Sequence, residues 1–186
     1  MPKTPPPSTP IFKKVRSKGI TPIGPKVKKS GLMTYDAYAK ASVSKFLAAT
    51  DFDERKMHSL VYGIEYIIDG VHYFKIGSAD LLQTIATPLG PKTGRICSSL
   101  TTLGKHFNKV RVAKIHFVIK DEPSRDLFKL LIESTLLKET ESYFVNPGEE
   151  KGLKLKEFRE MANIAEYYQK VEDLCAKNKL DYAIAR

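Results

Sequence analysis

The sequence lacks the features that define several classes of protein. Its 186 residues include two cysteines, Cys97 and Cys175, which lie far apart without the spacing of a metal site. Nothing therefore supports a disulfide framework or a zinc site, and a reducing, intracellular location is expected. No apolar run reaches the roughly 18 residues of a membrane span, and the N-terminus has no apolar signal-peptide core. We expect a soluble, unsecreted chain with no membrane partner. A nucleophilic triad, a nucleotide-binding fingerprint and internal repeats are also missing.

Acidic residues are missing from the first 30 positions. This segment holds eight basic residues and seven of the eleven prolines, which leaves only +2 of the net charge of +10 for the rest of the chain. Such a composition cannot bury enough apolar surface to fold, so residues 1–31 are predicted to be a disordered basic arm. The arm either binds nucleic-acid phosphates without reading sequence or is a solubilising or targeting tail. The candidate DNA-binding residues are Lys13, Lys14, Arg16, Lys18, Lys26, Lys28 and Lys29.

The most informative segment is a β-hairpin around Asp69-Gly70. Asp-Gly between two β-rich runs favours a type I′ turn, because both central positions need a positive φ. Side chains alternate between the two faces of a strand, so this turn also fixes which residues share a face. Two or three phenols and an ammonium on one face suit a site that binds an anion. The expected pairs are Ile68 with Val71, Tyr66 with Tyr73, Ile64 with Lys75, and Tyr62 with Gly77.

The remaining segments predict an α+β fold with a small, mostly antiparallel three-stranded sheet flanked by helices. Helices are expected over about 34–49, 95–103 and 153–177, and over a segment that begins at about 123 and ends near 146–148. A third strand is expected over 110–119 and a long loop over 79–94. We divide the chain into the basic arm (1–31), a helical lead-in (32–58), a central domain (59–148) and a C-terminal helical extension (149–186).

The order of these elements resembles the GIY-YIG nuclease superfamily. The matching segments are Gly63-Ile64-Glu65-Tyr66 for the first motif and Phe74-Lys75-Ile76-Gly77-Ser78 for the second, followed by Arg95, Glu133 and Asn146. Because lysine stands where the second motif usually has tyrosine, the closer similarity is to the KIG variant. The resemblance covers roughly residues 60–148. A histidine or tyrosine often follows the family's arginine by one helical turn, whereas this chain has Ser99.

The resemblance implies a metal-dependent endonuclease that hydrolyses phosphodiester bonds in DNA, or in RNA. Glu133 would hold a single Mg²⁺ or Mn²⁺, and Arg95 would bind the scissile phosphate. Tyr66 would deprotonate the attacking water, with its pKa lowered by Lys75 or the metal. Lys75 would also stabilise negative charge, and Asn146 would orient the carboxylate or close the helix end.

Structural roles remain open for the same residues. Tyr66 and Tyr73 can form an ordinary cross-strand pair, Lys75 can extend to solvent, and Asn146 before a proline is a good turn residue. Two other functions also remain open. One is a catalytically inactive nucleic-acid-binding protein on the same fold, and the other is a protein–protein adaptor that docks through the C-terminal helix.

Overall fold

The computed structural model describes residues 35–51, 59–79, 95–121 and 126–186. Residues 33–186 belong to one compact unit. The basic arm over 1–31 lies outside the described residues, as does nearly all of the predicted loop over 79–94. The expectations for these two segments therefore stay predictions.

The hairpin is present as predicted. Strands β1 (Ser59–Ile68) and β2 (Val71–Ala79) pair antiparallel in the expected register, including Ile64 opposite Lys75 and Tyr62 opposite Gly77. Asp69 and Gly70 both adopt positive φ, at 48° and 92°. These angles are what a type I′ turn requires, so the local sequence decides this part of the fold.

The sheet has five strands, so the prediction of three strands is wrong. Strands β3 (Val110–Asp121), β4 (Phe158–Glu160) and β5 (Tyr182–Ile184) join the hairpin in the antiparallel order β4-β2-β1-β3-β5. The two added edge strands have three residues each, too few for an alternating pattern to be recognised. The α+β class itself is confirmed.

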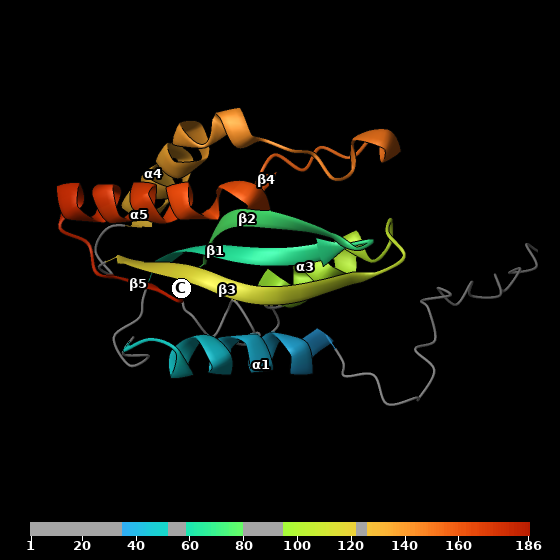
Figure 1. Cartoon of the computed structure of the whole chain (residues 1–186), viewed down its shortest axis with the longest axis horizontal. Helices are drawn as coiled ribbons and strands as arrows, with labels where there is room; N and C mark the ends of the chain where they lie inside the picture. The colour runs from blue at the N-terminus through green and yellow to red at the C-terminus, as the bar shows by residue number, and fades with distance from the viewer. Residues whose placement is uncertain (1–34, 52–58, 80–94, 122–125) are drawn as a thin grey trace, which may run out of the picture. The chain divides into compact units, whose positions relative to one another are not determined.

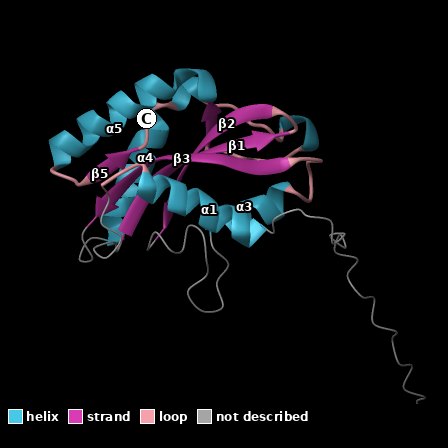
Figure 2. Ribbon diagram, turned by 60° about the horizontal axis from the view of Figure 1, so that its bottom comes forward, coloured by secondary structure: helices cyan, strands magenta, loops and turns pink. Residues whose placement is uncertain are grey.

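Two layers of helices cover the sheet, one on each face. Helices α1 (Tyr35–Ala48) and α3 (Arg95–Leu103) pack on one face, and α4 (Asp126–Glu139) and α5 (Ile164–Asn178) on the other, with a separate apolar core under each layer (Figures 1 and 2). Short 3₁₀ turns cover Glu141–Tyr143, Glu149–Lys151 and Met161–Asn163. No helix of the described residues is long and apolar enough to cross a membrane.

The predicted helix over 153–177 is wrong in its first third. Leu155, Phe158, Met161 and Ile164 occur at helical spacing, but the chain forms β4 and a 3₁₀ turn before α5 begins at Ile164. Phe158 is buried against Tyr66 and Tyr73, with ring centroids 6.0 and 6.3 Å apart. Tertiary packing on the sheet therefore overrides the helical periodicity here.

Strand β3 contains two irregularities that redirect its side chains. Its 12 residues pair with the ten of β1, and the register shifts between Gly63 and Ile64 and between Glu65 and Tyr66. The first shift leaves His116 without a partner residue on β1. A bulge of this kind re-aims a side chain, and His116 contacts Phe74 on the face covered by α4 and α5.

Candidate functional site

A cavity of about 430 Å³ lies at the β2 edge of the sheet. Strand β4 pairs with β2 only along Tyr73–Lys75, so the cavity occupies the part of this edge that β4 leaves uncovered. Residues from β1, β2, α3, α4, the segment before β4 and the first residue of β4 line it. They are Tyr62, Lys75, Gly77, Ser78, Arg95, Ser98, Ser99, Thr102, Leu103, Glu133, Leu155, Glu157 and Phe158.

Lys75 is the most constrained cation of the cavity. Its side chain is 13% exposed, and its Nζ donates a hydrogen bond to Ser99 Oγ at 3.0 Å and lies 2.9 Å from Glu157 Oε2. An ammonium has three N–H donors, so these two partners among the described residues leave a third donor for a ligand in the cavity. Ser99, which stands where the resembled family often has histidine or tyrosine, thus orients the lysine.

Arg95 and Glu133 line the same cavity from two different helices. Arg95 is the exposed first residue of α3, whose first turn contains no acidic residue. A guanidinium is unfavourable beside the positive end of a helix dipole unless an anion is also present, and both groups attract such an anion. The half-buried carboxylate of Glu133 adds an acceptor. Three of the five predicted site residues, Lys75, Arg95 and Glu133, are therefore brought together.

Tyr62, and not Tyr66, is the phenol that lines the cavity. Tyr66 is 1% exposed beneath Phe158. Burial raises the pKa of Tyr66, and a hydrogen bond with Ser99 opposes this only in part. Burial also raises the pKa of Tyr62, with Glu157 and Glu133 adding to the effect and Arg95 opposing it. In the free protein the pKa of Tyr66 is thus raised rather than lowered, because desolvation of the phenolate dominates.

Gly77 makes room for the Tyr62 side chain. A Cβ atom at position 77 would lie 2.7 Å from the Tyr62 hydroxyl oxygen and 2.8 Å from Cζ, closer than real contacts allow. Tyr62 and Gly77 are opposite each other in the hairpin, so the phenol crosses over the glycine. The glycine of the Lys-Ile-Gly segment therefore has a steric role in the cavity.

Asn146 does not line the cavity. Its Nδ2 donates to the Leu153 carbonyl at 2.6 Å, and its Oδ1 accepts from the Gly148 amide at 3.1 Å. These bonds close the turn around Pro147, which is the structural role that its sequence context allows. Neither of these two bonds involves Glu133, the carboxylate that the resemblance gave it as one possible partner.

The cavity offers few protein ligands for a metal ion. Within the described residues, no group of three or more His, Cys, Asp or Glu side chains could hold an ion. Two carboxylates line the cavity beside the phosphate-binding cations, and because Glu157 is paired with Lys75, Glu133 is the one without such a partner among the described residues. Such a site suits a hard cation that keeps several waters and shares substrate oxygens, as Mg²⁺ does.

Two of the five ionisable residues that line the cavity, Tyr62 and Glu157, are not among the site residues predicted from the sequence. Tyr62 shares the predicted face of the hairpin with Tyr66 four positions later; alternation does not distinguish the two, and the resemblance favours Tyr66. Glu157 lies beyond the segment that resembles the nuclease superfamily, in a stretch whose apolar spacing predicted a helix. No local signal marks it, because its position depends on β4 joining the sheet.

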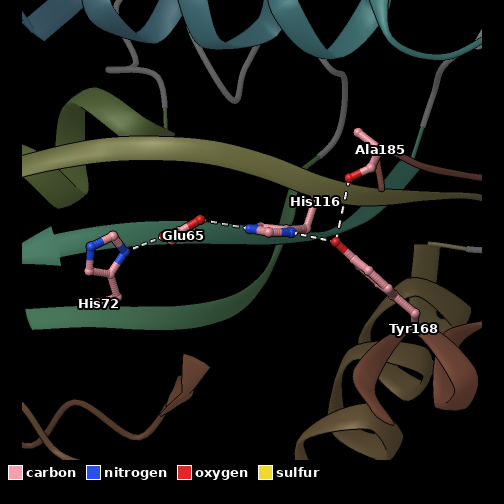
Figure 3. Close-up of polar contacts among 5 residues, drawn as sticks. All are labelled: Glu65, His72, His116, Tyr168 and Ala185. Carbon is pink, nitrogen blue, oxygen red and sulfur yellow. Dashed lines mark hydrogen bonds and ion pairs between the residues drawn. The ribbon is translucent and has the colours of Figure 1, made fainter. Parts of the chain in front are cut away.

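A second cluster of polar side chains lies on the opposite face of the sheet (Figure 3). Glu65 accepts hydrogen bonds from His72 and from His116 Nε2, the latter at 2.9 Å. His116 Nδ1 lies 2.6 Å from the Tyr168 hydroxyl, which in turn is 3.4 Å from the Ala185 carbonyl oxygen. His116 is 5% exposed. The cluster joins three strands, α5 and the C-terminal segment.

Comparisons with known proteins give no relative for this chain. No protein-family model matches it. No curated protein and no solved structure matches it either. The functional argument therefore depends on the residues and geometry of the cavity.

Proposed function

We propose that the chain is a metal-dependent endonuclease that hydrolyses phosphodiester bonds in DNA. The observation that carries this proposal is the meeting of four unlike side chains from four elements in one cavity: Tyr62, Lys75, Arg95 and Glu133. Phosphodiester hydrolysis needs an anion site, stabilisation of charge on the phosphoryl oxygens and an acidic ligand for a metal that activates the attacking water. The cavity offers a residue for each requirement.

Lys75 and Arg95 would bind and stabilise the phosphate. The planar fork of Arg95 suits two phosphoryl oxygens, and it is exposed at the start of α3. The Lys75 ammonium is less accessible and is held by Ser99, so it acts as a fixed point charge. Fixed charges stabilise a developing negative charge without a reorganisation cost.

Tyr62 acts in this proposal as a hydrogen-bond donor. Because burial raises its pKa, the phenol keeps its proton in the free protein. A neutral hydroxyl in the cavity can donate to a phosphoryl oxygen. We therefore assign Tyr62 to positioning the phosphate rather than to deprotonating water.

Glu133 is the residue that would hold Mg²⁺ or Mn²⁺. When bound, the ion would supply an activated water and Lewis-acid stabilisation of charge on the phosphoryl oxygens. The carboxylate lines the cavity that Lys75 and Arg95 share, so an ion there would lie beside the phosphate. The basic arm, with Lys13, Lys14, Arg16, Lys18, Lys26, Lys28 and Lys29, would add affinity that is independent of sequence.

Plasmid cleavage with Mg²⁺ tests the proposal. Glu133→Gln, Arg95→Ala and Lys75→Met are each expected to slow cleavage by roughly 100-fold or more, as loss of one preorganised charge typically does. Matched controls remove the same charges outside the cavity: Glu150→Gln, Arg111→Ala and Lys154→Met, all at exposed positions. Cleavage unchanged by all three cavity substitutions would overturn the proposal. Tight DNA binding with no cleavage in any metal would instead indicate a nucleic-acid-binding protein.

A further inference from the structure

Glu157 is the one acid of the described residues that contacts a cation of the cavity. Its backbone carbonyl accepts a hydrogen bond from the Ile76 amide at 3.1 Å, so the residue is fixed to β2 beside Lys75. The next residue, Phe158, pairs with Lys75 in the sheet and is buried. The backbone thus holds the Glu157 carboxylate close to one ammonium.

The side chain of Glu157 is half exposed although its backbone is fixed to β2. It is 48% exposed, whereas the Lys75 side chain is 13% exposed and also bonded to Ser99. A phosphate that approaches Lys75 therefore meets a carboxylate already in contact with the ammonium. Two anions beside a single cation repel each other, and the exposed carboxylate is the one that can turn away into solvent.

We propose that Glu157 is an internal competitor that occupies Lys75 in the free protein and that a substrate phosphate must displace. This deepens the proposed function and rests on it, since the displacing group is the phosphate of the same cavity. Glu157 is then a specificity-determining residue. It disfavours an isolated small anion, whereas a nucleic-acid strand, with further contacts along its backbone, compensates for displacing the carboxylate.

The charges of the cavity agree with this role. Lys75 and Arg95 are balanced by Glu133 and Glu157, so the free cavity has no excess positive charge from these four residues. Removing the charge of Glu157 leaves Lys75 uncompensated. Anion affinity should rise, whereas loss of an ordinary binding residue would lower it.

Titration with inorganic phosphate, without divalent metal, tests the inference and needs no cleavage. Changes in the NMR chemical shifts of the backbone amides around Ser78 and Ser99 report phosphate binding. Glu157→Gln is expected to bind phosphate about tenfold more tightly than the wild type. The matched control is Glu160→Gln, which removes the same charge three residues further on, from an exposed side chain that does not line the cavity. Its affinity should change by no more than about twofold. In a Lys75→Met background the gain from Glu157→Gln should disappear.

Equal gains for Glu157→Gln and Glu160→Gln would overturn the inference, because net charge alone would then explain them. A gain that persists without Lys75, or weaker binding by Glu157→Gln, would also overturn it. In the unmodified protein, saturating phosphate should abolish the through-hydrogen-bond coupling between Lys75 ¹⁵Nζ and Glu157 ¹³Cδ, and a coupling that survives contradicts displacement. If Glu157→Gln binds phosphate more tightly as expected but the protein cleaves no plasmid, the role of Glu157 stands and the nuclease proposal fails. If the protein cleaves plasmid but Glu157→Gln gains no phosphate affinity, only the role of Glu157 fails.

Discussion

The two faces of the sheet hold their charged groups in different ways. On one face, at the β2 edge, Lys75 has two partners and a cavity in front of it. On the other face, the two oxygens of Glu65 and the two ring nitrogens of His116 all have partners within the protein. Glu65 is adjacent to Ile64, which pairs with Lys75, so alternation along β1 separates the two clusters. We call the group around Glu65 and His116 the enclosed cluster, and the cavity around Lys75 the open site. We infer that the enclosed cluster serves stability and that the open site serves binding.

Replacing Lys75 by methionine should have the largest effect and should separate these roles. Plasmid cleavage is expected to fall by roughly 100- to 1,000-fold, as after loss of one preorganised charge. The free energy of unfolding should change by less than about 1 kcal/mol, because Glu157, the partner left behind, is half exposed and can be hydrated. Urea unfolding and cleavage rates measured on one preparation check both parts. A large loss of stability would show that the cavity lysine is structural.

On the face of the sheet that holds the enclosed cluster, we expect a substitution to lower stability and to leave cleavage unchanged. Glu65→Ala leaves the buried Nε2–H of His116 without an acceptor, so the free energy of unfolding should fall by about 2–3 kcal/mol. Cleavage per folded molecule should not change. His72→Ala is the matched control, because that partner of Glu65 is 51% exposed and its loss should cost less than about 1 kcal/mol. Equal losses in the two variants would contradict the distinction between the faces.

Local chemistry predicts much of the open site and little of the enclosed cluster. The Asp69-Gly70 turn sets the register that places Tyr62 and Lys75 on one face, and Arg95 begins the predicted helix. Glu157 and the edge strands follow from contacts between distant segments, which no short pattern records. His116 reaches Glu65 because β3 has a bulge that strand periodicity does not reveal.

The contact between Gly77 and Tyr62 allows a more local test of the open site. Gly77→Ala places a methyl group against the Tyr62 hydroxyl and ring, so it should destabilise the protein by about 1–2 kcal/mol and move the phenol out of position. Cleavage should fall as well. Truncating the ring in Gly77→Ala/Tyr62→Leu should recover part of the stability but none of the cleavage. Recovery of both would mean that the phenol has no role in the cavity.

The smallest expected effect is a pH dependence of stability that comes from the enclosed face. Burial lowers the pKa of His116, and hydrogen bonding to Glu65 opposes this only in part. The unfolded chain therefore binds a proton at His116 more readily, so stability should decrease as pH falls from about 7.5 to about 5.5. Burial would raise the pKa of Glu65, but hydrogen bonds from His72 and His116 outweigh it and lower the pKa below 4.5. The contribution of Glu65 to stability is therefore lost only at lower pH.

Protonation of His116 also reverses its hydrogen bond with Tyr168. The Tyr168 hydroxyl must then accept from Nδ1 and can donate to the Ala185 carbonyl. Urea unfolding of the wild type and of His116→Gln across this range checks the sign, and Lys114 and His72 are the other titratable groups nearby. The wild type should lose more stability on acidification than the variant, and an equal loss would assign the pH dependence to groups outside the cluster.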